Sequence, residues 1–307
     1  MNRPDESVVL IEGPWTHRTI RANGIAQHVV EAGTGPLVLL LHGMPTFWWT
    51  WAPQLIDLAD AGFRAVAVDL RGYGGSDKPP RGYDATTLAS DIASLVAALG
   101  ERDAVIVGND VGGLLAWTVA AHNPQVVRRI AVLGAAHPIR MRQAVFTDRK
   151  GQRHASAYAL KKFQLPRYGE RLLTQDSLYI KELFETWSGP RWRGTPSYVE
   201  AVERYAEAMR IHPVAHCSLE FFRWAVRSLP RPDGRRYMES MRAPIRRPVL
   251  QLHGDFDSCV LPRTAQGSSR HVSADYEWRL LTGIGHFPQH EAPERVSDEL
   301  IRWAKLD

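Results

Sequence analysis

Short and almost wholly apolar runs are the feature that most restricts the fold of this sequence. They lie at residues 36–42, 64–69, 104–108 and 127–134. Runs of this length and composition are typical of strands that are buried on both faces of a parallel sheet. The sequence therefore predicts a sheet that must be covered by helices on both sides.

Helical patterns separate these runs. Between the second and the third, four apolar residues recur at spacings of three and four and a glycine follows them, so we expect an amphipathic helix over residues 87–100. Strand patterns return at 248–253 and 276–281, and a last helix fits 293–303. This alternation predicts an α/β fold, with a mostly parallel central sheet and helices on both faces.

The chain between residues 138 and 245 differs from the rest. Its patterns are helical with few strand candidates, and it holds 20 Lys and Arg residues against 11 Asp and Glu. We expect a helical cap domain at 138–245, inserted into a core formed by 1–137 and 246–307, with a return linker at 228–234. Such a cap would cover the carboxyl ends of the strands, where open α/β sheets bind ligands.

Composition excludes several classes of protein. With 44% hydrophobic and 23% charged residues among 307, the chain has the make-up of a folded globular protein. No segment approaches the roughly 20 apolar residues of a membrane span, and the first residues lack the apolar core of a secretory signal. Cys217 and Cys259 are too few for a disulfide framework and lack the spacing of a zinc site.

We therefore expect a soluble, cytoplasmic protein with no membrane partner. The basic residues of 138–245 are scattered among apolar residues at helical spacing, without a nucleic-acid motif, so we interpret them as solvated helix faces rather than a nucleic-acid site. The oligomeric state stays open, a homodimer included.

The third apolar run leads into Gly-Asn-Asp-Val-Gly at 108–112 and then into a helical pattern. Strand, small-residue turn and helix in this order are the layout of a nucleophile elbow, in which a strained turn exposes one side chain. Serine is the usual exposed residue, whereas this sequence has Asp110. Because an aspartate at a helix start is often only a cap, the motif needs support from elsewhere in the chain.

Three further motifs follow predicted strands. His-Gly-Met-Pro at 42–45 follows the first run, where an oxyanion-hole N–H lies in α/β hydrolases. Asp255 and Asp257 follow the strand at 248–253, and His286 stands in a glycine-rich loop after the strand at 276–281. The order of nucleophile, acid and histidine is that of an α/β-hydrolase triad, and it favours a catalytic role for Asp110.

Together these motifs resemble the α/β-hydrolase superfamily and, within it, the epoxide hydrolases. The resemblance extends over nearly the whole chain and rests on four pieces: 42–45, 69–79, the aspartate elbow, and Gly-His-Phe-Pro-Gln-His-Glu at 285–291. The segment 162–166 is also similar to that family. By this likeness the triad acid is Asp257, five residues before Pro262, with Asp255 as the rival.

An aspartate nucleophile restricts the substrate. Its carboxylate is already ionised near neutral pH, and its attack on a saturated carbon that bears a leaving group gives an ordinary alkyl ester. His286, oriented by Asp257, would then deprotonate the water that hydrolyses this ester. Backbone N–H groups of Met44 and Val111 would hold the resulting oxyanion.

Three leaving groups compete. Haloalkane dehalogenases hold the departing halide with side-chain N–H donors, commonly a Trp directly after the nucleophile, where this chain has Val111. Fluoroacetate-type dehalogenases place arginines around the nucleophile, where Val111 and Leu114 stand here. Epoxide opening instead needs a proton donor for the ring oxygen, which the family supplies with cap tyrosines.

Tyr158 lies nearest to the first of these family tyrosines. The second precedes an arginine in the family, but the matching stretch here reads Phe-Phe-Arg at 221–223, so its hydroxyl is missing. Three explanations of the missing hydroxyl stay open. One donor is sufficient, or His212, His216 or Tyr205 replaces the second tyrosine, or the activity has diverged from epoxide opening.

The leading expectation is a cofactor-independent epoxide hydrolase that forms a vicinal diol through an ester on Asp110, with no metal. A haloalkane dehalogenase-like hydrolase and a non-catalytic ligand-binding member of the fold are the alternatives. Aromatic residues, Trp48 and Phe222 among them, are expected to line a pocket for a small apolar epoxide.

Overall fold

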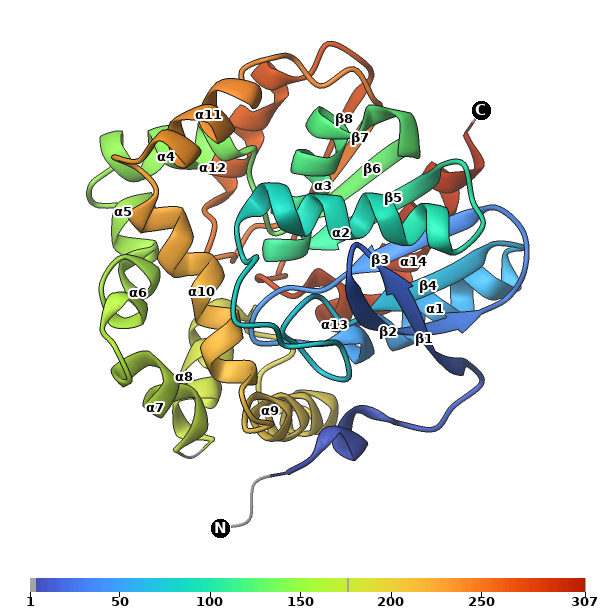
Figure 1. The fold of residues 1–307 in the computed structure, drawn as a ribbon, viewed down its shortest axis with the longest axis horizontal. Helices are drawn as coiled ribbons and strands as arrows, with labels where there is room; N and C mark the ends of the chain where they lie inside the picture. Colours follow the sequence, from blue (N-terminus) through green and yellow to red (C-terminus); the bar gives the residue numbers. More distant parts are fainter. Residues whose placement is uncertain (1–3, 176, 307) are drawn as a thin grey trace.

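The computed structural model describes residues 4–175 and 177–306. Eight strands form one sheet in the order β1-β2-β4-β3-β5-β6-β7-β8 (Figure 1). The strands are Thr16–Ala22 (β1), Ile25–Ala32 (β2), Leu37–Leu41 (β3), Arg64–Val68 (β4), Ala104–Asn109 (β5), Val127–Leu133 (β6), Val249–Gly254 (β7) and Tyr276–Leu281 (β8). Pairing is antiparallel from β1 to β2 and from β2 to β4, and parallel between all other neighbours. The prediction of an α/β fold with a mostly parallel sheet is confirmed.

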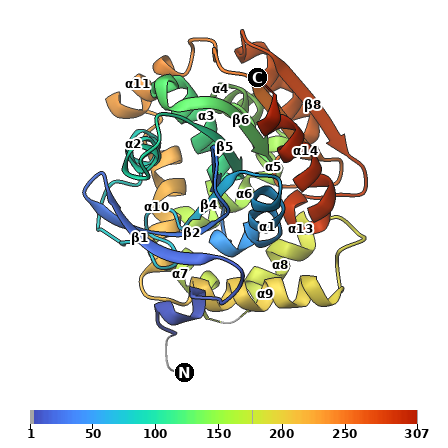
Figure 2. The ribbon, with the colours of Figure 1, turned by 90° about the vertical axis from the view of Figure 1, so that its right-hand side faces the viewer.

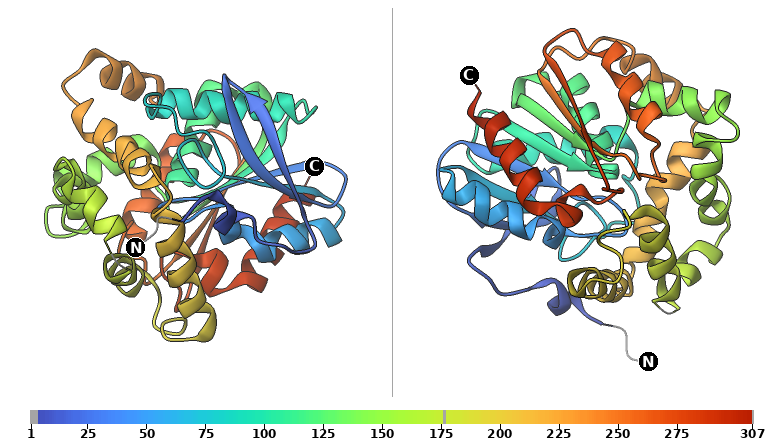
Figure 3. Two further views of the ribbon diagram at one scale, coloured as in Figure 1. Left: turned by 60° about the horizontal axis from the view of Figure 1, so that its bottom comes forward. Right: turned by 180° about the vertical axis from the view of Figure 1, so that it is seen from behind.

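The apolar runs form the middle of this sheet. Every residue of β3, β5 and β7 is buried, because helices cover both faces. Helices α1 (Ala52–Asp60) and α14 (Pro293–Lys305) lie side by side on one face, while α2 (Ala85–Ala98) and α3 (Val111–His122) pack together on the other (Figure 2). Seen from behind, α1 and α14 again run next to each other (Figure 3).

The amino-terminal hairpin of β1 and β2 was not anticipated. The sequence of β1 is mostly polar. Four of its seven residues are exposed, and only Ala22 is buried. An edge strand of this kind carries no apolar run, so the signal that identified the central strands is absent from it.

Between β6 and β7 the described residues form helices and no strand. These are α4 (Pro138–Thr147), α5 (Gln152–Ala155), α6 (Ala157–Leu160), η4 (Lys162–Gln164), α7 (Tyr168–Thr174), α8 (Leu178–Trp187), α9 (Pro196–Met209), α10 (Val214–Arg227) and α11 (Pro232–Ser240). They gather on one side of the molecule, at the left in Figure 1. We call this stretch, residues 138–245, the cap segment; its limits as a separate domain stay a prediction.

Shorter elements complete the chain: η1 (Glu6–Val9), η2 (Trp48–Trp51), η3 (Pro124–Val126), α12 (Pro262–Gln266), η5 (Gly267–His271) and α13 (Pro288–Glu291). Among the described residues, no helix combines the length and the apolar character needed to cross a membrane.

Candidate active site

Asp110 occupies a strained turn between the end of β5 and the start of α3. Its backbone has φ 51° and ψ −116°, a conformation that costs a residue other than glycine roughly 1–3 kcal/mol. Small neighbours permit the turn, since a Cβ atom at Gly112 would overlap the carbonyl oxygen of Leu41. The Asp110 side chain makes no capping hydrogen bond to α3, so the alternative of a simple helix cap does not describe its contacts.

Instead, the carboxylate of Asp110 faces two other loops at the same edge of the sheet. The backbone N–H of Met44 donates to Oδ2 at 3.0 Å. Oδ1 lies 3.8 Å from Nε2 of His286, which is longer than a direct hydrogen bond. Val111, the first residue of α3, follows directly, and the N–H groups in the first turn of a helix have no intrahelical partner.

His286 and Asp257 form a buried pair. Nδ1 of His286 lies 2.9 Å from Oδ2 of Asp257, and both side chains are fully shielded from solvent. The other oxygen of Asp257 accepts the backbone N–H groups of Cys259 and Val260 at 2.9 and 2.8 Å. The carboxylate is thereby fixed in the orientation that the imidazole requires.

The rival acid, Asp255, lies elsewhere. Its carboxylate accepts the backbone N–H of Gly283 at 2.7 Å and so closes the turn that leads to the histidine loop. The structure therefore brings Asp257, and not Asp255, to His286.

The charges around His286 determine its protonation. Burial opposes a charged imidazole, but the carboxylate of Asp257, then Cys259 and the carboxylate of Asp110 outweigh it, and together they hold the pKa of His286 well above its ordinary value. The imidazole is thus stabilised as a cation for as long as both carboxylates are charged. Its Nε2 has no hydrogen-bond partner in the described structure.

Glu291 holds the loop of this histidine from both sides. Its carboxylate accepts the backbone N–H of Gly285 at 2.8 Å and of Phe287 at 3.1 Å. It also accepts the N–H of Gly189, in the cap segment, at 2.7 Å. The Glu291 carboxylate therefore joins the loop of His286 to the cap segment.

Two further bonds fix the backbone of His286. Its N–H donates to the carbonyl oxygen of Trp187 at 2.8 Å, and its carbonyl oxygen accepts from Nδ2 of Asn109 at 3.0 Å. The Asn109 side-chain oxygen accepts in turn from Gln289 at 3.2 Å. No role was predicted for Glu291 or Gln289, although both stand in the stretch 285–291 that carries the family resemblance.

A cavity of about 320 Å³ opens beside Asp110, between the sheet edge and the cap segment. The predicted residues Val111, Tyr158 and Phe222 line it, together with Leu114, Met141, Phe221, Trp224, Tyr237 and others, and most of the lining residues are apolar. A pocket with this lining suits an apolar ligand.

Trp48 does not line this cavity. It is fully buried, its indole N–H donates to the carbonyl oxygen of Val9 at 2.8 Å, and its ring meets the edge of Trp15. The expectation that it contacts substrate is therefore corrected: Trp48 anchors the amino-terminal arm. Aromatic composition alone could not distinguish a core indole from a pocket indole.

Tyr158 presents a hydroxyl inside the cavity. Its oxygen lies 3.3 Å from the sulfur of Cys259, and burial, with Cys259 and Asp110 nearby, raises the pKa of Tyr158 well above its usual range. The phenol therefore stays protonated and can act as a donor. The hydroxyl of Tyr237, also in the lining, is already paired with that of Thr118 at 3.0 Å.

The three residues named as substitutes for a second tyrosine do not line the cavity. His212 and His216 are exposed, and the ring of His216 contacts the carboxylate of Glu170. Tyr205 is buried and its hydroxyl is bonded to His290.

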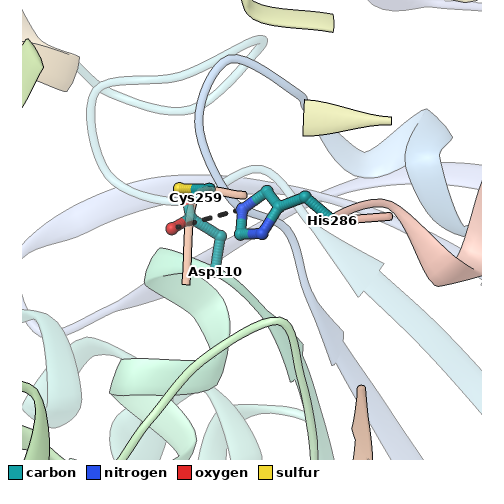
Figure 4. A group of neighbouring side chains, drawn as sticks. All are labelled: Asp110, Cys259 and His286. Atoms are coloured by element: carbon teal, nitrogen blue, oxygen red, sulfur yellow. Dashed lines mark ion pairs between the residues drawn. The ribbon is translucent and has the colours of Figure 1, made fainter. Parts of the chain in front are cut away.

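Cys259 is the unexpected neighbour of the site. One ligand atom each from Asp110, Cys259 and His286 lie within 4.8 Å of one another, and among the described residues this is the one His, Cys, Asp and Glu group close enough to hold a metal ion (Figure 4). The spacing of residues in the sequence could not reveal this group, because the three residues come from the separate loops that follow β5, β7 and β8.

Proteins of known family are similar to this chain in sequence and in fold. The sequence model of a family described as "alpha/beta hydrolase fold" matches residues 36–293. The chain belongs to the α/β-hydrolase family. Over 294 residues the hydrolase is 30% identical to epoxide hydrolase 3 of Xenopus tropicalis, covering 94% of this chain and 77% of that protein. It is 29% identical to epoxide hydrolase 4 of Mus musculus over 300 residues, covering 96% and 80%.

Solved structures give the same family. The hydrolase superposes on an epoxide hydrolase from Vigna radiata with a TM-score of 0.77 and 26% identity, covering 95% of this chain and 98% of that one. Its similarity to epoxide hydrolase A from Mycobacterium thermoresistibile has the same TM-score, with 25% identity and coverage of 94% and 98%. Family and relatives together support hydrolase activity for the chain.

Proposed function

We propose that this α/β hydrolase opens an epoxide to a vicinal diol through a covalent ester on Asp110. The observation that carries the proposal is the state of the Asp110 carboxylate. It does not cap its helix, it faces a histidine–aspartate pair, and it borders a largely apolar cavity that contains a tyrosine hydroxyl. The relatives that are named epoxide hydrolases support the same substrate class.

In the first half of the reaction, the Asp110 carboxylate attacks one carbon of the epoxide. The bond from that carbon to the ring oxygen breaks, and the oxygen takes the proton of Tyr158. Without such a donor the step would release an alkoxide, so a positioned phenol lowers the barrier. Residues 138–245, as a cap, would supply this donor and exclude bulk water.

In the second half, His286 removes a proton from water, and the resulting hydroxide attacks the ester carbonyl of Asp110. The 3.8 Å between His286 Nε2 and Asp110 Oδ1 is long enough for this water to bridge them. The Met44 N–H, already bonded to Oδ2, would stabilise the tetrahedral oxyanion together with the Val111 N–H. Collapse expels the product alkoxide, which takes the acid proton of Asp110 and leaves as the diol, and His286 is again an imidazolium.

The pKa of His286 links the two halves. While Asp110 is a carboxylate, its charge contributes to the raised pKa of His286. Esterification makes the Asp110 side chain neutral and removes that contribution. The pKa of His286 then falls, its proton passes to the Tyr158 phenolate left by the first half of the reaction, and the neutral imidazole becomes available as a base at the stage that needs one.

The lining of the cavity favours an epoxide over a haloalkane. Val111 and Met44 carry no side-chain N–H for a departing halide. Trp224 is the one tryptophan among the described lining residues, and its indole N–H already donates to Asp233 at 3.2 Å. Among the described lining residues, no tryptophan N–H is therefore unpaired and available as a halide clamp of that kind.

The test is product formation from a panel of aromatic and aliphatic epoxides, with chloroalkanes and bromoalkanes assayed in parallel. We expect diol from at least one epoxide, no halide release, and loss of diol formation in Asp110→Asn. Halide release without diol would transfer the assignment to a dehalogenase. Silence in both assays alongside tight ligand binding would favour a non-catalytic binder.

A further inference from the structure

Cys259 completes a group of three possible metal ligands beside the cavity. Its sulfur, a carboxylate oxygen of Asp110 and a ring nitrogen of His286 lie within 4.8 Å of one another. Cys259 and His286 are buried, and Nε2 of His286 has no hydrogen-bond partner in the described structure. Figure 4 shows the three side chains converging on one point from separate loops.

We propose that these three residues bind a thiophilic divalent cation, Zn²⁺ or Cd²⁺, and that the bound cation inhibits the hydrolase. Thiolate, imidazole and carboxylate are the ligands that Zn²⁺ takes in proteins. Zn²⁺ bonds of about 2.0–2.3 Å place neighbouring tetrahedral ligands roughly 3.3–3.8 Å apart. The 3.8 Å between Oδ1 of Asp110 and Nε2 of His286 already matches this spacing.

The partners of these ligands orient them for a metal. The Nδ1 atom of His286 is held by Asp257 at 2.9 Å, which is the carboxylate–histidine arrangement that directs Nε2 at metal ions. The Met44 N–H engages Oδ2 of Asp110 and leaves Oδ1 free to coordinate. Three protein ligands leave a fourth position for water on the side of the cavity.

Metal binding exchanges protons and requires no oxidant or reductant. The S–H bond of Cys259 breaks as the sulfur–metal bond forms, and that proton, with any proton on Nε2 of His286, passes to solvent. A cation bonded to Oδ1 occupies the oxygen that would attack the substrate. Inhibition therefore rests on the proposed function, whereas binding does not.

The chain supplies its own matched control. Cys217, the other cysteine, is also buried, but it lies in α10 against Gly72 and Tyr83. Cys259→Ser keeps a small polar group beside Tyr158 and removes the soft ligand, while Cys217→Ser removes a thiol remote from the site. Cys217→Ser should retain hydrolysis within a few-fold of the parent protein, and the inhibition of each variant is measured relative to its own metal-free rate.

The experiment titrates the metal-free protein with Cd²⁺ and follows the ultraviolet charge-transfer band of a cadmium–thiolate bond. We expect the band in the parent protein and in Cys217→Ser, and its loss in Cys259→Ser. A band that survives in Cys259→Ser, or that is absent from the parent protein, would overturn the site. This readout does not depend on catalysis, so it separates failure of the metal site from failure of the proposed function.

A second measurement tests inhibition. Zn²⁺ should reduce epoxide hydrolysis by the parent protein and by Cys217→Ser, and a chelator should restore it. Cys259→Ser should need at least about tenfold more Zn²⁺ for the same inhibition, the order of loss seen when a metal site is weakened. Equal sensitivity of all three proteins would overturn the assignment of inhibition to this site.

Discussion

The floor and the roof of the cavity are built in different ways. The floor consists of residues that follow β5, β6 and β7, and the polar groups of the site beside it are held by hydrogen bonds to backbone or to one another. The roof consists of largely apolar side chains of the cap segment, and aromatic rings among them pack edge to face, such as Tyr158 against Phe222 at 6.2 Å between centroids.

Because of this difference, we expect the floor to carry out the reaction and the roof to select the substrate. Hydrogen-bonded groups on short loops of a rigid sheet keep the geometry that bond making requires. Packed rings carry little directional information, so we expect the roof to select by size and shape and to contribute the Tyr158 hydroxyl to the proposed chemistry. Substitutions in the floor should therefore cost far more activity than substitutions in the roof.

The largest effect is expected in the floor, from Asp257→Asn. The amide cannot stabilise the imidazolium of His286 or fix its tautomer, so turnover should fall roughly 10⁴-fold, as in other triads. Steady-state kinetics on a responsive epoxide measures it. Asp255→Asn, which keeps an oxygen for the Gly283 N–H, is the matched control and should change turnover only a few-fold. Equal losses in both variants would count against Asp257 as the acid.

The next effect concerns the Tyr158 hydroxyl of the roof. Tyr158→Phe should slow ester formation by about 100-fold, the usual contribution of a positioned general acid, and should change ester hydrolysis much less. Single-turnover kinetics separates the two steps. Tyr237→Phe removes a hydroxyl from the same cavity that is already paired with Thr118, and it should leave ester formation nearly unchanged. The prediction fails if the two variants behave alike.

A smaller effect is expected where the roof lacks a second hydroxyl. Phe222→Tyr adds one beside Tyr158 and should speed ester formation by about 2- to 10-fold, the equivalent of one hydrogen bond of roughly 0.5–1.5 kcal/mol. Phe221→Tyr is the control on the adjacent position. A slower Phe222→Tyr enzyme would mean that the roof has been shaped for a different substrate.

The smallest expected change is one of protonation. NMR titration should find the His286 pKa above its ordinary value of about 6.5, lower in Asp110→Asn, and lower still in Asp257→Asn, because Asp257 contributes more to the shift. A raised pKa in the folded state means that this imidazole stabilises the fold fully below about pH 6.5 and less as pH rises through the folded-state pKa. An unshifted His286 would remove the proposed link between ester formation and water activation.

The sequence was informative where burial is continuous. Strands β3 to β7 coincide with apolar runs to within a residue or two, because a strand covered on both faces must be apolar throughout. Strand β8, at the edge of the sheet, is only partly buried and was predicted from a mixed pattern. The β1–β2 hairpin was missed because its exposed edge carries no such pattern. The order of nucleophile, acid and histidine along the chain predicted that Asp110 and His286 meet an acid that follows β7, because the carboxyl ends of parallel strands share one edge of the sheet. The choice of Asp257 over Asp255 came from the family resemblance.

Contacts between distant segments could not be predicted in the same way. The position of Cys259 against Asp110, and the bonds from Glu291 to both the histidine loop and the cap segment, depend on how loops fold back in space. Trp48 shows the opposite failure, because its size suggested a pocket wall and its indole N–H is instead bound to Val9. The residue type determines the chemistry of a side chain, whereas its position in the fold depends on packing between distant segments.

The most direct measurement is mass spectrometry of His286→Gln after mixing with an epoxide that the parent enzyme hydrolyses. Without a base to activate water, the ester should accumulate, and digestion should locate the added mass of one substrate molecule on the peptide that contains Asp110. A variant that still binds the epoxide yet leaves Asp110 unmodified would contradict the account.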